Sequence, residues 1–334
     1  MGITRLVYAP DSTYAIGIDL GGTKINAGIV DERGQVLSAC SLPTLPGQGS
    51  IPDRIMEILG KLFQNEGGPD LFRIRGIGVA SAGQINWEQG SVHFSTELIP
   101  GYTGTPLRRI LEERFQMPVF VDNDVNVLTL TEKRLGAAQG LRHFLCLALG
   151  TGVGGGIMVD GQIVRGSWGG AGEIGHMSVD FDGLPCICGG VGCLEQYASG
   201  TGIGARMRKE LEDMGQNAAG VDAREVMALW QAGDPAASKI MDETFRALGS
   251  ALASLIHMFN PEMIVLGGGV AESGEAFIDR VREETMRRAM PSFTGSLRIV
   301  SAYRGNYSGM IGAGLQLWEY PLRMPASGRE GKAL

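Results

Sequence analysis

A glycine-rich hairpin that occurs twice constrains the fold more than any other feature of this 334-residue chain. The segment GIDLGGTKINAGIVDERGQVL, which begins at Gly17, is matched about 130 residues later by ALGTGVGGGIMVDGQIV, which begins at Ala148. Each segment has the pattern of a strand, a glycine turn, a second strand, an Asp…Gly turn and a third strand. A repeat of this kind indicates one supersecondary unit used twice, and the length suits two lobes. The sequence therefore predicts two α/β lobes, each built on such a hairpin.

The glycine turns resemble two nucleotide-binding motifs that their context does not support. Gly150–Gly155 fits G-x-G-x-x-G, and Gly17–Lys24 nearly fits a P-loop. Both motifs require a helix directly after the loop, whereas each of these loops is followed by a strand pattern. Backbone N–H groups in such turns can instead form a concave site for an anion. The alternative interpretation is that both are ordinary hairpin turns.

Composition narrows the class of protein. The chain contains 52 glycines, about twice the usual fraction of ~7%, which favours special backbone positions over a flexible tract. Its net charge of −7 disfavours a nucleic-acid partner, which would call for a basic face. The sequence contains no run of about 18 uncharged apolar residues, so we expect no membrane-spanning helix. Because no secretory signal is recognisable either, we expect a cytoplasmic protein without a membrane partner.

Carboxylates follow two predicted strands. The apolar run Val119–Val121 leads into Asp122-Asn123-Asp124, and Asp19 ends the first strand of the first hairpin. An Asp at a strand end can act as a general base that accepts the proton of an attacking hydroxyl group. The alternative role is a helix N-cap, which Asn and Asp favour. Asp19 is suited to hold Mg²⁺ through water, since Mg²⁺ prefers one or two carboxylates together with phosphates.

A metal site is predicted in the middle of the chain. His176, Cys186, Cys188 and Cys193 lie within 18 residues, and four such ligands suit a structural, tetrahedral Zn²⁺ site without an open position. The segment is short and rich in glycine, so zinc would supply much of its folding free energy. The alternative is three reduced thiols and an unrelated histidine. Glu173 and Glu195 flank the cluster, and ordering the loop would fix both carboxylates.

The glycine loops resemble those of a large superfamily. Asp19-Leu-Gly-Gly-Thr-Lys24 and Gly150-Thr-Gly152 look like the phosphate-binding pair of the actin/hexokinase superfamily, and Gly267-Gly268-Gly269 resembles its adenosine-binding loop. The resemblance implies the α/β, two-lobed actin/hexokinase-like (ribonuclease H-like) fold, with ATP in a central cleft. We expect an N-terminal lobe at 1–121, with the C-terminal helix 306–334 packed back on it, and a larger lobe with the zinc loop at 122–305. The residues then expected at the nucleotide and its Mg²⁺ are Asp19, Gly21, Gly22, Thr23, Lys24, Gly150, Thr151, Gly152, Gly267, Gly268 and Gly269.

The metal segment carries a narrower resemblance. Glu173-Ile-Gly-His176 and Cys186-Ile-Cys-Gly-Gly-Val-Gly-Cys-Leu-Glu195 resemble the ROK family (repressor, open reading frame, kinase), over roughly residues 14–320. The resemblance implies that Asp124 is the general base of a sugar kinase that works as a homodimer. It implies a sugar-side set of Gly83, Asn123, Glu173, His176 and Glu195, with His176 also on zinc.

The substrate is narrowed to a hexose. The loop Ala80-Ser-Ala-Gly83-Gln-Ile-Asn86 lacks the Pro-Gly turn of many glucokinases of the family, and in its N-acetylmannosamine kinase branch the residues matching Gly83, Gln84 and Thr96 lie near the substituent at C2. The hypothesis is an ATP–Mg²⁺ hexose 6-phosphotransferase acting on N-acetylmannosamine, another N-acetylhexosamine or glucose. The alternative is a sugar-sensing regulator without catalysis. Repressors of the family carry an N-terminal helix-turn-helix, whereas only 13 residues precede the first predicted strand here.

Overall fold

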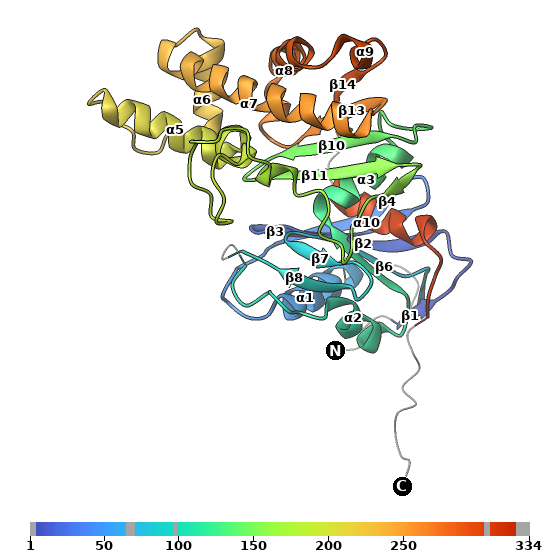
Figure 1. Ribbon diagram of the computed structural model, residues 1–334. Helices are drawn as coiled ribbons and strands as arrows, with labels where there is room; N and C mark the ends of the chain where they lie inside the picture. Colours follow the sequence, from blue (N-terminus) through green and yellow to red (C-terminus); the bar gives the residue numbers. More distant parts are fainter. Residues whose placement is uncertain (1–4, 65–70, 97–98, 304–307, 325–334) are drawn as a thin grey trace. The chain divides into compact units, whose positions relative to one another are not determined.

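Each copy of the repeated hairpin begins its own five-stranded sheet. The structure is a computed structural model that describes residues 5–64, 71–96, 99–303 and 308–324. The chain divides into two units: residues 1–135, 165–171 and 304–334 make the first, and residues 136–164 and 172–303 make the second. Each unit holds one of the two sheets (Figure 1), as the repeat predicts.

In the first unit the hairpin is extended by parallel strands. β2 (Tyr14–Leu20) pairs antiparallel with β3 (Lys24–Asp31), which pairs antiparallel with β4 (Val36–Pro43). On its other side β2 pairs parallel with β6 (Ile77–Ser81), and β6 pairs parallel with β9 (Val119–Asn123). The order is β4-β3-β2-β6-β9. The carboxyl ends of β2, β6 and β9 therefore lie at one edge of the sheet, where ligands bind in open α/β sheets.

The sheet of the second unit has the same plan. β12 (Gln162–Ile163), β11 (Val153–Val159) and β10 (Phe144–Leu149) form the antiparallel part. β10 then pairs parallel with β13 (Met263–Gly267), and β13 with β14 (Arg298–Ser301). The order β12-β11-β10-β13-β14 matches the order β4-β3-β2-β6-β9 of the other sheet strand for strand.

The two faces of the first sheet are covered differently. Ile16, Ile18 and Leu20 of β2 belong to the core beneath α1 (Ile51–Gln64) and α2 (Leu107–Phe115). The alternate residues face α10 (Ser308–Glu319) at very short range, because side chains of a strand alternate between faces. A Cβ atom on Gly17 would lie 1.9 Å from the Met310 carbonyl oxygen. Glycine is therefore required there for the helix to rest directly on the sheet.

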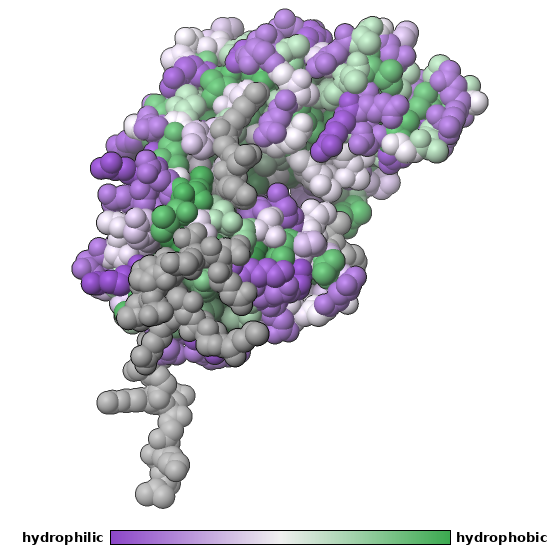
Figure 2. All heavy atoms as spheres, turned by 180° about the vertical axis from the view of Figure 1, so that it is seen from behind, coloured by the Kyte–Doolittle hydropathy of each residue, from purple (hydrophilic) through white to green (hydrophobic). Residues whose placement is uncertain are grey.

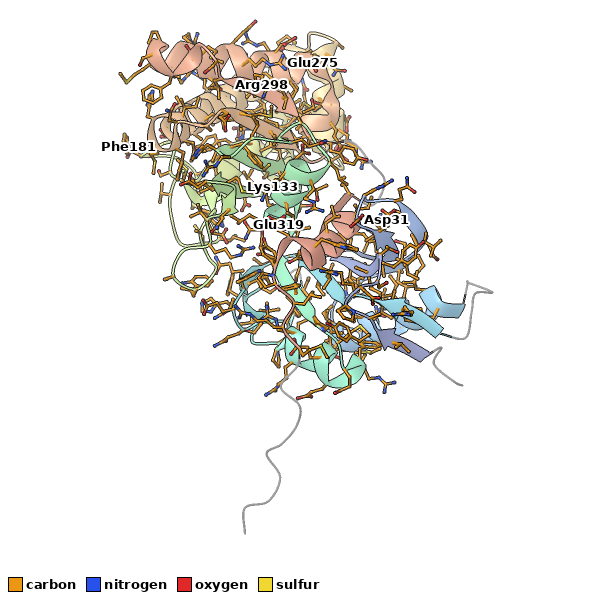
Figure 3. All side chains as sticks on the ribbon, turned by 90° about the vertical axis from the view of Figure 1, so that its right-hand side faces the viewer. Asp31, Lys133, Phe181, Glu275, Arg298 and Glu319 are labelled. Carbon is orange, nitrogen blue, oxygen red and sulfur yellow. The ribbon has the colours of Figure 1, made fainter. Side chains whose placement is uncertain are left out.

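α3 (Asp124–Arg134) also belongs to the first unit. The first stretch of this unit therefore ends at Leu135, and not after residue 121 as predicted. A Cβ atom on Gly312 of α10 would lie 2.0 Å from the Thr131 hydroxyl oxygen, so the two helices are in direct contact. The Lys133 ammonium lies 2.6 Å from the Glu319 carboxylate and joins the same helices (Figure 3). This packing between distant segments explains the difference. Of the predicted C-terminal helix 306–334, the part from Ser308 to Glu319 is helical, and 306–307 and 325–334 lie outside the described residues.

Two small sheets complete the first unit. β1 (Arg5–Tyr8) pairs parallel with β5 (Leu71–Ile74), and β7 (Gln84–Asn86) pairs antiparallel with β8 (Ser91–Phe94). The β7–β8 hairpin directly follows the loop that contains Gly83. It therefore extends the segment for which a sugar-side role is predicted.

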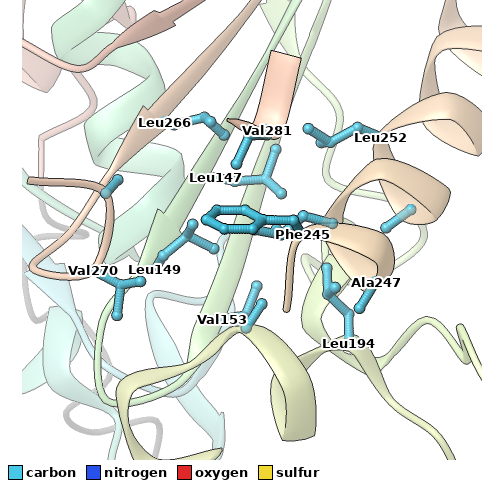
Figure 4. Close-up of a cluster of buried hydrophobic side chains, with 14 of the residues drawn as sticks. Leu147, Leu149, Val153, Leu194, Phe245, Ala247, Leu252, Leu266, Val270 and Val281 are labelled. Carbon is cyan, nitrogen blue, oxygen red and sulfur yellow. The ribbon is translucent and has the colours of Figure 1, made fainter. Parts of the chain in front are cut away.

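The core of the second unit lies between its sheet and its longest described helix. Phe245 of α7 (Pro235–Phe259) packs among Leu147, Leu149 and Leu252 (Figure 4). Asp234 caps the start of α7, and Asn260 ends it in a left-handed conformation. The remaining helical elements of this unit are η1 (Ile174–His176), α4 (Leu194–Ala198), α5 (Gly200–Asp213), α6 (Ala223–Gln231), η2 (Ala271–Ser273), α8 (Glu275–Arg288) and α9 (Pro291–Thr294).

The described helices were compared with what a membrane-spanning helix requires. None of the helices within residues 5–64, 71–96, 99–303 and 308–324 combines the length and the apolar character needed to cross a bilayer. On the face seen in Figure 2, polar residues are interspersed with small hydrophobic patches.

Candidate functional site

The first glycine turn is held in shape by a threonine from the next strand connection. The Gly21 N–H donates to the Lys24 carbonyl oxygen at 3.0 Å, which closes the turn between β2 and β3. The Thr44 hydroxyl donates to the Gly21 carbonyl oxygen at 2.7 Å, and the Thr44 N–H donates to the Thr23 carbonyl oxygen at 2.9 Å. These hydrogen bonds engage the carbonyl oxygens of Gly21, Thr23 and Lys24. The N–H groups of Gly22 and Thr23 are the candidates in this turn to bind an anion.

Asp19 lies one residue before the end of β2, opposite Asn26 of β3. The Asn26 side-chain amide donates to Asp19 Oδ2 at 3.1 Å, and Ser41 donates to Asn26 Oδ1 at 2.7 Å. Burial raises the pKa of the Asp19 carboxyl, while the Asn26 hydrogen bond and the charge of Lys24 act in the opposite direction. A carboxylate held in one orientation, in a place where negative charge is costly, is well suited to a cation. The residues present therefore fit Mg²⁺.

At the corner between β9 and α3, the predicted roles of helix N-cap and general base fall to different residues. Asn123 is the N-cap of α3, because its Oδ1 accepts from the N–H groups of Val125 at 2.9 Å and Asn126 at 3.3 Å. Asp124 is the first residue of the helix, and its side chain is exposed. The capping role thus belongs mainly to Asn123, and Asp124 presents a carboxylate at the carboxyl edge of the sheet.

The sugar-side loop is tied to this corner. The Asn123 side-chain amide donates to the Gly83 carbonyl oxygen at 3.0 Å. Gly83 has φ +95°, and a Cβ atom there would lie 2.7 Å from the Phe94 carbonyl oxygen. Thr96 follows β8 and is half-buried. The first unit therefore brings Asp19, Gly83 and Asp124 to one edge, where β2, β6 and β9 end side by side.

The second glycine turn occupies the same position in the second sheet. The Gly150 N–H donates to the Gly152 carbonyl oxygen at 2.9 Å, and the Gly200 N–H donates to the Gly150 carbonyl oxygen at 2.8 Å. Gly268 has φ +86°, and a Cβ atom there would lie 2.5 Å from the Leu149 carbonyl oxygen. Only glycine allows this approach, so the predicted loop Gly267–Gly269 lies directly beside the end of β10.

A cavity of about 970 Å³ opens at this edge of the second unit, a size that suits a nucleotide. The predicted residues Gly150, Thr151 and Gly269 line it. The rest of the lining carries no motif in the sequence and comes from α5, from α6 and its N-cap, and from the segment after β13: Gly200, Thr201, Arg208, Asp222, Ala223, Arg224, Met227, Ala228, Gln231, Val270 and Ser273. The signal that would have found it is long-range, namely the hydrogen bond from Gly200 to Gly150.

A second cavity, of about 910 Å³, lies between the cysteine segment, α5 and α7. None of the residues predicted to bind sugar, nucleotide or metal lines it. Its charges are neutralised from within, because Lys239 pairs with Glu210 at 2.6 Å and Arg206 with Glu243 at 3.0 Å. The cavity beside the glycine turn is therefore the better candidate for a nucleotide.

The four predicted metal ligands come together. The side-chain ligand atoms of His176, Cys186, Cys188 and Cys193 all lie within 4.8 Å of one another. His176 Nδ1 is 3.7 Å from Cys186 Sγ, and Cys188 Sγ is 3.6 Å from Cys193 Sγ. Ligands around a tetrahedral zinc ion lie about 3.5–3.8 Å apart, given Zn–S near 2.3 Å and Zn–N near 2.0–2.1 Å. These two distances match a tetrahedral zinc site, and the pairs as far apart as 4.8 Å would draw closer on binding.

Zinc would change both the charge and the order of this segment. Burial and the neighbouring Cys188 and Cys186 thiols raise the pKa of the Cys193 thiol to about 12, and zinc requires the thiolate. The loop has little core of its own: Phe181 is 96% exposed and projects from the ribbon in Figure 3. Bound zinc would therefore both ionise the thiols and order the loop.

The two flanking glutamates lie in different settings. Glu195, on α4, accepts a hydrogen bond at Oε2 from the Val153 N–H at 2.9 Å, and a Cβ atom on Gly152 would lie 2.4 Å from the same oxygen. Glu195 is thus attached to the second glycine turn. Glu173 precedes η1, and its carbonyl oxygen accepts from the His176 N–H at 3.1 Å. Glu173 is therefore tied to His176 of the cluster through its backbone, and Glu195 to the second glycine turn through its side chain.

The chain is similar to known sugar kinases along nearly its whole length. A glucokinase of Thermotoga maritima is 36% identical over 308 residues, which span 89% of this chain and 95% of the relative. An N-acetyl-D-glucosamine kinase of Salmonella paratyphi B is 29% identical over 309 residues, 89% of this chain and 97% of the relative.

A solved structure supports the same grouping. The ROK family glucokinase of Streptomyces griseus, crystallised with glucose and AMPPNP, superposes with a TM-score of 0.78 at 31% identity, covering 92% of this chain and all of that one. This likeness confirms the predicted actin/hexokinase-like fold class. The ROK family model matches residues 15–319, close to the predicted extent. With its glycine turns, its acidic corner and its Cys/His cluster all in place, the chain belongs to the ROK family.

Proposed function

We propose that this protein is an ATP-dependent kinase that transfers the γ-phosphate to the 6-hydroxyl of a hexose. The observation that carries the proposal is the duplicated sheet edge. One copy presents two separate aspartates, Asp19 and Asp124, and the other presents a glycine turn beside a nucleotide-sized cavity. A phosphoryl acceptor needs a base, and a triphosphate needs N–H donors and a cation.

Asp124 acts as the general base. Its carboxylate accepts the proton of the sugar hydroxyl while the hydroxyl oxygen forms its bond to the γ-phosphorus and the bond from phosphorus to the bridging oxygen of ADP breaks. Such assistance contributes about 10²–10⁴ in rate. Asn123 supports this step by capping α3 and by holding the Gly83 carbonyl group. When bound, Mg²⁺ at Asp19 would neutralise charge on the phosphates.

The nucleotide is held by the second unit. The glycine turn at Gly150–Gly152 donates N–H groups to the phosphates, and the adenosine occupies the cavity lined by α5, α6 and Gly269. Thr151 and Thr201 supply hydroxyl groups at its glycine side. The predicted role of Gly267–Gly269 as an adenosine loop is supported by its position against β10.

The sugar is recognised by hydroxyl-binding groups near the metal segment. With His176 Nδ1 directed at the cysteine cluster, its Nε2 is the atom to donate to a sugar hydroxyl. Glu195 holds the glycine turn through Oε2, so its Oε1 is the atom to accept a second hydroxyl, and Glu173 a third. Zinc is a structural element in this scheme, because four protein ligands leave no coordination position for substrate.

Glucose is our first candidate substrate, and an N-acetylhexosamine is the second. The glucokinase relatives favour glucose, whereas the Gly83-Gln84 loop without a Pro-Gly turn favours an acetylated sugar. The two differ by one substituent at C2, and a small group in a pocket changes specificity by about 10–200-fold. We also expect a homodimer, which light scattering would report as about 71 kDa, twice the 35.5 kDa chain.

The test is ADP release by the purified protein with Mg-ATP across glucose, mannose, allose, fructose, N-acetylglucosamine and N-acetylmannosamine. We expect one sugar to exceed the rest in kcat/KM. Asp124→Asn should lower kcat with that sugar by about 10²-fold or more, while ATP affinity measured by calorimetry stays unchanged. Sugar binding without turnover by the wild type would instead support the regulator, and an active Asp124→Asn variant would remove Asp124 as the base.

A further inference from the structure

One short segment of the first unit, called the strap here, is flanked in sequence by residues of the second unit. Residues 165–171 belong to the first unit, although the residues before and after them belong to the second. This strap lies against the β7–β8 hairpin: the rings of Trp168 and His93 are 4.1 Å apart. Gly169 has φ +117°, and a Cβ atom there would lie 2.2 Å from the Ile85 carbonyl oxygen. The strap is therefore closely packed, and its first residue is Arg165.

Arg165 makes a buried ion pair beneath the acidic corner. Its Nη2 lies 2.5 Å from Asp122 Oδ2 and 2.7 Å from the Tyr320 hydroxyl. The Arg165 side chain is 15% exposed and that of Asp122 is 3% exposed. The guanidinium also stacks over Trp87, 4.3 Å from the ring centroid, and over Tyr320 at 5.2 Å. Two aromatic rings and a carboxylate thus fix its position.

Asp122 also contacts the turn that carries Asn123 and Asp124. Its second oxygen, Oδ1, accepts from the Asn123 N–H at 2.9 Å and from the Asn126 side-chain amide at 3.0 Å. Asn123 in turn caps α3, on which Asp124 is the first residue. An ion pair so deeply buried is strongly disturbed when one partner is removed, because the other charge is left uncompensated.

We propose that Arg165 is a positioning residue of the reaction, which holds the turn carrying Asn123 and Asp124 in place through its ion pair with Asp122. The inference rests on the proposed kinase function and goes beyond it, since Arg165 lies on a strap with no motif of its own. A displacement of about 1 Å at a catalytic group can cost about 10²-fold in rate. The effect belongs in kcat, since Arg165 is not assigned to either substrate.

The test compares Arg165→Met, Arg165→Lys and the double variant Arg165→Met/Asp122→Asn with the wild type. Arg165→Met should lower kcat by about tenfold or more, with the KM for ATP within about twofold of the wild-type value. The double variant should recover most of that loss, because the asparagine that replaces Asp122 carries no charge to compensate and keeps the oxygen that accepts from Asn123 and Asn126. Arg165→Lys, which keeps the charge but not the planar stacking, should lie between.

Arg75→Met is the matched control. Arg75 is also a partly buried arginine of the first unit, stacked over an aromatic ring of α10 (Trp318, 5.8 Å) and donating to the Leu317 carbonyl oxygen at 2.8 Å. It should lower the melting temperature as Arg165→Met does but leave kcat of the folded protein unchanged. Equal kcat losses in the two variants, or no rescue by Asp122→Asn, would overturn the inference while leaving the kinase function intact. A wild type without turnover on any sugar would overturn both.

Discussion

At the scale of single residues, the acidic corner shows how neighbouring side chains divide their work. Asp122, Asn123 and Asp124 are adjacent in sequence, yet one is buried in an ion pair, one caps a helix and one is exposed. The division follows from the backbone, because a strand that turns directly into a helix points successive side chains in different directions. Substitutions at the three positions should therefore have different kinetic signatures rather than a common loss.

Asp19 gives a prediction for pH and metal. Burial raises the pKa of its carboxyl, so protons compete with Mg²⁺ at a higher pH than they would at an exposed aspartate. The Mg²⁺ concentration for half-maximal activity should therefore rise as the pH is lowered. Asp19→Asn, which keeps an oxygen in place but cannot titrate, should need more Mg²⁺ at every pH and lose that dependence. Mg²⁺ titrations at several pH values check this, and identical curves for both proteins would contradict it.

At the scale of elements, the cysteine loop gives the second prediction. Because residues 177–193 have exposed apolar side chains and converging ligands, we expect about one zinc per chain. Removal by a chelator such as phenanthroline should speed amide hydrogen exchange in this loop and raise the KM for sugar, since Glu173 and Glu195 flank it. Cys188→Ser should do the same. Cys40→Ser, outside the cluster, is the control and should keep its zinc. Full activity and unchanged exchange without metal would contradict the assignment.

The elements also show what the sequence can predict. The two hairpins, the acidic corner and the metal ligands were predictable because each is encoded within about 20 residues, by glycine turns and ligand spacing. The lining from α5 and α6, the packing of α3 on α10 and the strap on the β7–β8 hairpin depend on contacts between distant segments. Arg165 illustrates the difference. Its neighbours in sequence give no hint of Asp122, which lies 43 residues away and only 2.5 Å from it.

At the scale of the whole molecule, the assigned groups are split between the units. Asn123 and Asp124 belong to the first, whereas the nucleotide cavity and the candidate sugar ligands Glu173 and Glu195 belong to the second. In the proposed function, the acceptor therefore needs both the base Asp124 and the sugar ligands. Water makes no such set of contacts, so it gains little of the positioning that a bound sugar hydroxyl receives.

ATP hydrolysis without sugar should accordingly be at least about 10²-fold slower than phosphorylation of the preferred sugar. A sugar analogue that lacks only the 6-hydroxyl should bind and raise the hydrolysis rate, because it occupies the proposed sugar ligands while leaving room for water at Asp124. Phosphate release measured with ATP alone, with the analogue and with the full substrate tests this, and Asp124→Asn supplies the baseline. Hydrolysis without sugar as fast as phosphorylation would mean that one unit organises the reaction by itself. The duplicated sheet would then be a record of ancestry rather than a requirement of the chemistry.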